Sequence, residues 1–132
     1  PLCVIDLDTV MTSTSLYDFG DAIRSYTNTG KEDDNYLDNV SMYLERFRAF
    51  AEGYLSEQKS LNSIELQWLA FSARYITYEQ ALRFLMDYIN GDTYYKIAFP
   101  EHNLIRTCAQ LHLLESMEEQ YDAMCAIILE LS

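Results

Sequence analysis

The chain has 132 residues, of which 49% are hydrophobic and 14% aromatic, so it can bury a moderate core and is not a disordered segment. Its 21 acidic and 9 basic residues give a formal charge of −12, and such a surface repels nucleic acid and anionic lipid. The sequence has no apolar run near the roughly 18 residues of a membrane span, and no signal-peptide pattern opens it. We therefore expect one domain over residues 1–132, with no nucleic-acid or membrane partner.

The three cysteines are Cys3, Cys108 and Cys125, and they form no C-x-x-C pair. They fit neither a disulfide framework nor a zinc site. Cys108 and Cys125 fall in an apolar helical pattern, which predicts buried free thiols. Free thiols persist in a reducing compartment, so the sequence predicts a cytoplasmic protein.

The chain begins with a predicted strand and a predicted helix. Apolar residues over 2–8 predict a short buried strand, and the small hydroxyl residues over 11–15 predict a loop. A helix is expected to begin at Ser15 or Leu16 and to fade over 28–30, where Asn, Thr and Gly follow one another.

A second helix is expected after the charged run over 31–34, which is most simply a solvated loop. Its apolar residues recur at spacings of 3 and 4, and this helix is expected to stop within 56–60. The spacing predicts one buried stripe made of Leu37, Val40, Leu44, Phe47, Ala51 and Tyr54.

Two longer helices complete the prediction. Asn62 or Ser63 can cap the third, and Gly91 suits the left-handed position that ends it. An aromatic connector over 92–99 leads to Pro100, where the last helix is expected to start. The predicted buried face of the third helix comprises Ile64, Trp68, Phe71, Tyr75, Tyr78, Leu82, Leu85 and Ile89. That of the last helix comprises Leu104, Cys108, Leu111, Leu114, Met117, Tyr121, Met124 and Ile128.

Asp6 and Asp8 stand at the end of the predicted strand, on the same side of it. Carboxylate oxygens are the ligands that Mg²⁺ prefers, so this pair can form part of a metal site. A strand that ends in two solvated aspartates is the alternative, and the spacing alone does not decide between them.

Four blocks in order carry a family resemblance: V-I-D-L-D-T-V-M over 4–11, L-Y-D-F-G-D-A-I-R over 16–24, G-D-T-Y-Y over 91–95 and F-P-E-H-N-L-I-R over 99–106. They resemble the C-terminal part of the aminoglycoside phosphotransferase and choline kinase superfamily. Within it they are similar to N-acetylhexosamine 1-kinases. The resemblance implies a mainly α fold, the helical C-terminal lobe of a protein-kinase-like phosphotransferase with one short N-terminal strand.

The same resemblance implies roles for three aspartates. Asp6 falls where the superfamily places the aspartate that binds Mg²⁺ between the ATP phosphates. Asp8 binds a second cation or orients the loop. Asp18 resembles the residue at a helix start that braces the catalytic loop, a structural support of the site.

The catalytic H-x-D-x-x-x-x-N loop and the nucleotide-binding N-lobe of such kinases have no counterpart in this sequence. They are expected upstream of Leu2, and a chain that opens with Pro1 and runs directly into a strand is expected to continue a longer protein. A chain with the metal aspartate but without the base and the nucleotide pocket is expected to have little activity alone.

On the sugar side, Arg83 and Tyr94 are the predicted substrate-binding residues. Arg83 can donate hydrogen bonds to sugar hydroxyls, or it can form an ordinary ion-pair ladder with Glu79 and Asp87 at i, i+4 and i+8. Tyr94 can stack on a pyranose ring, or it can simply pack in the connector.

The sequence thus predicts the C-terminal part of an ATP-dependent kinase acting at the anomeric hydroxyl of a hexosamine-type sugar. A non-catalytic acidic helical module that binds protein is the alternative. A homodimer through the strand edge over 2–10 is also expected. Relatives of this type are sometimes named mucin-desulfating sulfatases, but Cys3 is not followed by the C-x-P-x-R pattern of that chemistry.

Overall fold

The computed structural model describes residues 10–132, and 69% of these residues are helical, with essentially no strand. The mainly α prediction is confirmed for this part of the chain. The predicted strand over 2–8, with Asp6, Asp8 and Cys3, lies outside the described residues. The elements are α1 (Leu16–Thr27), a 3-10 turn η1 (Leu37–Asn39), α2 (Leu44–Glu57), α3 (Ser63–Ile89), α4 (His102–Glu119) and α5 (Tyr121–Leu131).

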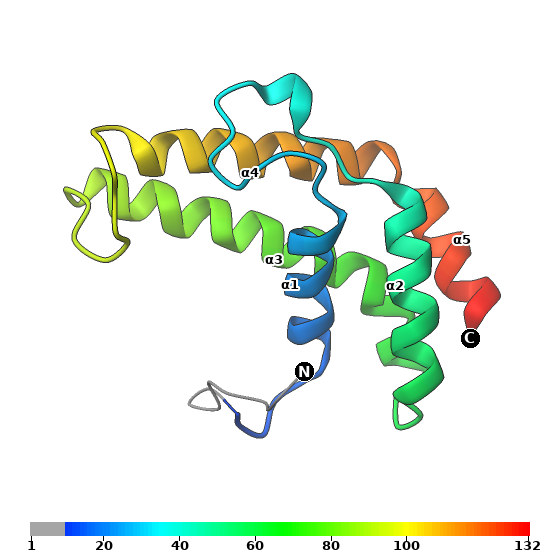
Figure 1. Ribbon diagram of the computed structural model, residues 1–132. Helices are drawn as coiled ribbons and strands as arrows, with labels where there is room; N and C mark the ends of the chain where they lie inside the picture. The colour runs from blue at the N-terminus through cyan, green and yellow to red at the C-terminus, as the bar shows by residue number, and fades with distance from the viewer. Residues whose placement is uncertain (1–9) are drawn as a thin grey trace, which may run out of the picture.

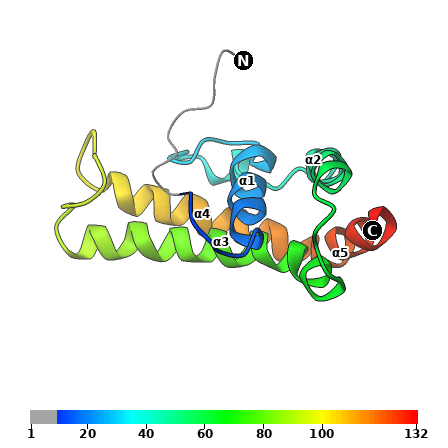
Figure 2. The ribbon, with the colours of Figure 1, turned by 90° about the horizontal axis from the view of Figure 1, so that it is seen from below.

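The longest helix, α3, organises the fold. Figure 1 shows α4 alongside α3, with α1 and α2 running across this pair and α5 beside α2. Seen from below in Figure 2, α3 runs along one edge of the molecule, with α1, α2 and α4 on its inner side. All five helices contribute to one core, whose fully buried side chains include Phe19, Ile23, Phe47, Leu69, Ala73, Leu113, Met117 and Met124. Among the described residues, none of the helices is both long and apolar enough to cross a bilayer.

A glycine sets how closely α1 packs on α3. A Cβ atom added at Gly20 would lie 2.6 Å from the carbonyl oxygen of Ser72, well inside van der Waals contact. Only glycine therefore lets the two backbones approach in this way.

The ends of α3 follow the sequence signals. Asn62 accepts hydrogen bonds from the backbone N–H groups of Ile64 and Glu65, at 2.9 and 3.0 Å, and the Glu65 carboxylate accepts from the Asn62 N–H. This reciprocal capping box confirms the predicted start. At the other end Gly91 has a φ of 86°, the left-handed conformation predicted for it.

The second helix begins later than predicted, at Leu44 and not at Leu37. Leu37 lies in η1, and the following residues are extended. There Thr29 and Ser41 share a backbone hydrogen bond of 3.0 Å, and Tyr43 N–H donates to Thr27 at 2.9 Å. Pairing with the end of α1 thus occupies the backbone groups that a helix would have used. The predicted stop near 56–60 is confirmed at Glu57.

The predicted buried face of α3 is wrong, because seven of its eight residues are exposed and Leu85 is half-buried. We call these eight residues, Ile64, Trp68, Phe71, Tyr75, Tyr78, Leu82, Leu85 and Ile89, the outer stripe of α3. The opposite face of the helix packs inward instead. Small side chains dominate that face and let α1 and α4 approach closely, and its buried residues are Leu69, Ala70, Ser72, Ala73, Thr77, Ala81, Phe84 and Asp87.

The predicted last helix is two helices, α4 and α5, which meet at Gln120. The side chain of Gln120 donates to the carbonyl of Met42 at 2.9 Å, which ties this junction to the start of α2. Two residues of the predicted buried stripe, Cys108 and Leu111, are exposed. Cys108 is therefore not the core thiol that was predicted, whereas Cys125 is half-buried; both are free.

The charged run over 31–34 is a loop, as predicted, but it is not simply solvated. Glu32 pairs with Arg24 at 2.9 Å, and Asp33 lies 3.0 Å from the buried ring of His102. The run therefore links the loop after α1 to α1 itself, through Arg24, and to the first turn of α4, through His102.

Candidate functional site

A cleft of about 560 Å³ opens between α1 and α3. It brings together two of the residues singled out in the sequence, Asp18 from α1 and Arg83 from α3. Charged, amide and phenol side chains form most of its wall. The lining residues are Tyr17, Asp18, Asp21 and Arg24 on α1, and Tyr75, Ile76, Glu79, Gln80 and Arg83 on α3.

One end of the cleft is already neutralised within the protein. Arg24 donates to Asp21 at 2.8 Å, to Glu32 at 2.9 Å and to Gln110 at 3.2 Å. Burial alone would lower the pKa of Arg24, but the hydrogen bonds and charges of Asp21 and Glu32 outweigh burial and raise it. Arg24 is therefore a structural cation that is already paired with two carboxylates.

Arg83 differs from Arg24 in its pairing. Among residues 10–132 it forms no ion pair, and its guanidinium carbon lies 5.8 Å from the ring centroid of Tyr95. The ladder with Glu79 and Asp87 is thus absent from the described part of the chain. The Arg83 donors remain available to a ligand, and Glu79 and Gln80 stand beside them on the same cleft wall.

Tyr94 does not line the cleft. It is 74% exposed, so it is not a core residue, and its ring meets that of Tyr95 edge-on with 4.8 Å between centroids. Tyr95 in turn accepts a hydrogen bond of 3.1 Å from the Gln80 side chain, and its ring meets that of Phe84 at a tilt of 56° with 4.7 Å between centroids. Tyr94 is therefore linked to the cleft only through Tyr95.

Asp87 holds the connector that carries both tyrosines. Its carboxylate accepts hydrogen bonds from the backbone N–H groups of Thr93, Tyr94 and Tyr95 at 2.8–2.9 Å. Burial by itself would raise the pKa of Asp87, but these donors and the Asn103 amide outweigh burial and lower it. Asp87 is a structural anion and not a partner of Arg83.

Two aromatic rings, one from each helix, belong to the cleft wall. Tyr17 and Tyr75 stack with 6.2 Å between centroids and an angle of 27° between ring planes. Sequence reasoning assigned Tyr75 to the core and did not select Tyr17, Gln80 or Glu79 as ligand-binding residues. Their convergence depends on how α1 crosses α3, which no local pattern encodes.

The predicted metal ligands Asp6 and Asp8 lie outside the described residues. Within 10–132, no group of three or more His, Cys, Asp or Glu side chains is arranged to hold a metal ion.

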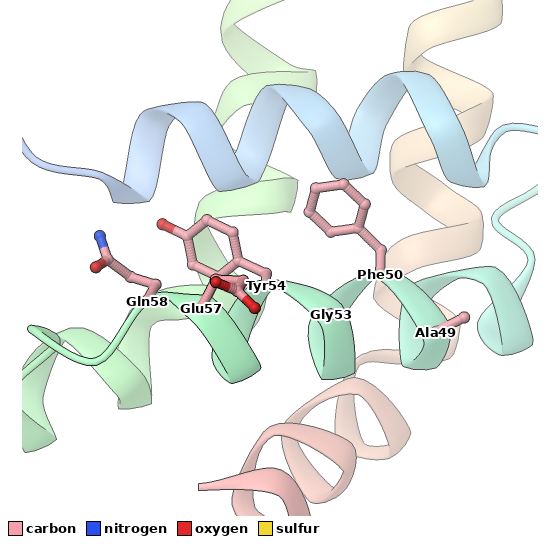
Figure 3. Close-up of a pocket in the computed structure, with 6 residues that line it drawn as sticks. All are labelled: Ala49, Phe50, Gly53, Tyr54, Glu57 and Gln58. Carbon is pink, nitrogen blue, oxygen red and sulfur yellow. The ribbon is translucent and has the colours of Figure 1, made fainter. Parts of the chain in front are cut away.

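A second hollow, also about 560 Å³, lies along α2 and faces α1 (Figure 3). Figure 3 shows the rings of Phe50 and Tyr54 turned toward α1. Both rings pack on the buried Phe19, with centroids 5.8 and 5.0 Å from it. Its polar groups are few, Glu57 and Gln58 at one end, so this hollow is mainly the outer side of a core contact.

No model of a known protein family matches this chain. The family assignment rests on the resemblance of the four sequence blocks alone, so it is a proposal.

Proposed function

We propose that this chain is the C-terminal part of an ATP-dependent kinase that phosphorylates a hexosamine-type sugar at its anomeric hydroxyl. In this proposal residues 1–132 form part of the helical C-terminal lobe of a protein-kinase-like phosphotransferase, in the cytoplasm. The observation that carries the proposal is the cleft between α1 and α3, which Asp18 and Arg83 both line. The family resemblance had assigned one of them to the support of the site and the other to the substrate.

The groups in the cleft suit a sugar. A pyranose presents hydroxyls that both donate and accept hydrogen bonds, and apolar C–H faces that stack on aromatic rings. Glu79 can accept from such hydroxyls, whereas Gln80 and Arg83 can donate to them. Tyr17 and Tyr75 place a stacked pair of rings on the cleft wall, and a volume of about 560 Å³ lies within the usual range of small-molecule sites.

The chain is proposed to bind and orient the sugar. Asp6 and Asp8 are proposed to bind Mg²⁺, which supplies charge neutralisation at the ATP phosphates when bound. The catalytic base and the nucleotide pocket are expected on residues that precede Pro1 in the complete protein. Residues 1–132 alone are thus expected to bind a hexosamine without phosphorylating it.

Sugar binding to residues 1–132 is the direct test. Isothermal titration or ligand-observed NMR with a panel of hexosamines should detect binding to at least one of them. Arg83→Ala should weaken it by about tenfold, the loss expected for roughly one charged hydrogen bond. Arg48→Ala is the matched control, because Arg48 pairs with Glu130 on the surface and does not line the cleft.

Phosphorylation tests the rest of the proposal in the longer protein. ATP-dependent turnover of the bound sugar is expected there, and Asp6→Ala should abolish it, whereas Asp38→Ala should not. If no hexosamine binds and the longer protein lacks both the H-x-D-x-x-x-x-N loop and kinase activity, the kinase proposal fails.

A non-catalytic protein-interaction module is the second candidate function. The exposed outer stripe of α3 favours it, because apolar surface on this scale marks interaction sites. A retained hexosamine site, lost with Arg83→Ala, would argue for the kinase over this alternative.

A further inference from the structure

The helix α3 is apolar on two opposite faces. Its inner face is buried against α1 and α4, and the outer stripe is open, with Trp68 and Tyr78 each 48% exposed and Ile89 70% exposed. Figure 2 shows α3 at the edge of the molecule, with the neighbouring helices on its inner side. An apolar stripe along a helix is normally buried against another element. Residues 14–17 lie beside Trp68, Phe71 and Tyr75. The rest of the outer stripe lacks a partner layer within the described residues.

The outer stripe has the spacing of a helix-pairing seam. From Ile64 to Ile89 its members follow one another at alternating steps of 4 and 3 residues, and none of them is charged. This is the heptad pattern in which one helix packs along another. It runs almost the full 27 residues of α3.

The exposed area is sufficient for a stable contact. The four aromatic members are 36–48% exposed and three of the aliphatic members are 45–70% exposed. With ~150–250 Å² for each aromatic side chain and somewhat less for each aliphatic one, the stripe leaves on the order of 700 Å² open. One partner in a standard interface contributes about 800 Å². The largest apolar patch on a typical monomer covers only ~300–600 Å².

We propose that the outer stripe binds a second copy of this chain, with the two α3 helices antiparallel about a two-fold axis between Tyr75 and Tyr78. An isologous interface requires a surface that complements itself. In this arrangement the aromatic N-terminal half of one copy's outer stripe meets the C-terminal half of the other copy's stripe, where the side chains are smaller. Phe71 faces Leu82 of the second copy, and Tyr75 faces its Tyr78. A parallel pair would instead set Trp68 against Trp68.

Charge modulates this contact. Each copy carries a formal charge of −12, so the two copies repel at long range. Salt screens this repulsion, with a Debye length of about 10 Å at 0.1 M, and leaves the apolar contact intact. Dimerisation is therefore expected to strengthen as salt rises.

Sedimentation equilibrium of residues 1–132 tests the proposal, and Trp68 is a built-in reporter because it is the only tryptophan. The expected result is a dimer, with a blue shift of tryptophan emission as protein concentration rises. Tyr78→Glu should weaken the dimer by at least about tenfold, as for loss of a central interface side chain. Tyr36→Glu makes the same charge change at a residue that is 75% exposed outside α3 and should leave the dimer intact.

The orientation is tested by cross-linking, with Cys3, Cys108 and Cys125 replaced by serine. A mixture of Phe71→Cys and Leu82→Cys copies should form the mixed disulfide in preference to either self-pair. A monomer at high concentration and high salt, a dimer that Tyr78→Glu leaves unchanged, or preferential self-pairing would each overturn the proposal.

The outer stripe and the sugar cleft share one residue, Tyr75. The two proposals are separated by variants at residues that belong to only one of the two surfaces, with sugar binding measured at a protein concentration at which the chain is monomeric. Tyr78 does not line the cleft, so Tyr78→Glu should leave hexosamine binding unchanged. Arg83→Ala is correspondingly expected to leave the dimer unchanged. Failure of one proposal is thus distinguishable from failure of the other.

Discussion

The carboxylate of Asp87 and the side-chain amide of Asn103 join α3 to α4, with 2.9 Å between Oδ2 and Nδ2. Both side chains are buried. The same amide nitrogen donates to Asp92 at 2.8 Å, a residue held at a φ of 58°. With the backbone donors of 93–95, this cluster satisfies the polar groups of the turn between the two longest helices.

Asp87→Asn is expected to lower the thermal midpoint of unfolding. The amide of asparagine carries one acceptor oxygen, so at least one of the connector N–H groups and the Asn103 amide would lose its partner. Far-UV circular dichroism during heating measures this. Asp38→Asn makes the same charge change at an exposed site and should leave the midpoint unchanged; an equal loss there would indicate a general charge effect.

Stability should fall in acid below about pH 4. The pKa of Asp87 is lowered from its usual 3.8 by its hydrogen bonds, and that of Asp33 is lowered by the hydrogen bond from His102. A carboxyl with a lower pKa when folded binds fewer protons in the folded state. Its stabilisation is thus fully present above pH 3.8 and disappears as pH falls through the folded pKa.

Denaturant titrations at pH 3–6 measure this dependence. The free energy of unfolding should be steady at the upper end and decline toward the lower end. Asp87→Asn should flatten the decline, because that position no longer titrates. An unchanged pH dependence in Asp87→Asn would show that other carboxyls account for it.

The two glycines in helices should respond oppositely to alanine. Gly20→Ala places a methyl group 2.6 Å from the backbone oxygen of Ser72 and should cost about 1–3 kcal/mol through overpacking. Gly53→Ala meets nothing within 4 Å and should stabilise α2 by about 0.5–1 kcal/mol through helix propensity. Chemical denaturation measures both, and destabilisation by Gly53→Ala would contradict the open space beside that residue.

Asn62→Ala should destabilise the protein by about 0.5–2 kcal/mol, because the backbone N–H groups of Ile64 and Glu65 lose their acceptor at the start of α3. Asn62→Ser keeps an acceptor at the cap and should retain most of the stability. Equal losses in the two variants would exclude capping as the cause. Denaturant midpoints are sufficient for this comparison.

The sequence predicted where the helices begin and end better than how they pack against one another. The start of α3 at its cap Asn62 and its end before Gly91 follow from capping chemistry, which acts within a few residues. The start of α1 at Leu16 was also predicted, although Ser15 makes no side-chain capping hydrogen bond there. The start at Leu44 was missed because a backbone pairing with the end of α1 overrode a continuous apolar pattern. Likewise, nothing local marks Gln120 as the junction of α4 and α5.

At the candidate site, the sequence selected Asp18 and Arg83, and the structure places both in one cleft. It did not select Gln80 or Tyr17, whose positions depend on the crossing of α1 and α3. It also left open whether Asp87 pairs with Arg83. The fold decides this, because the connector turns back over Asp87 and offers it backbone donors.

By itself the sequence determined the helical class, the acidic surface and the chemistry of the helix ends, since each depends on composition or on neighbours along the chain. Only the tertiary structure decided which face of α3 is buried. Both faces have helical apolar spacing, so periodicity cannot choose between them. The choice depends on close approach, which Gly20 and the small residues of the inner face permit and the bulky rings of the outer stripe prevent.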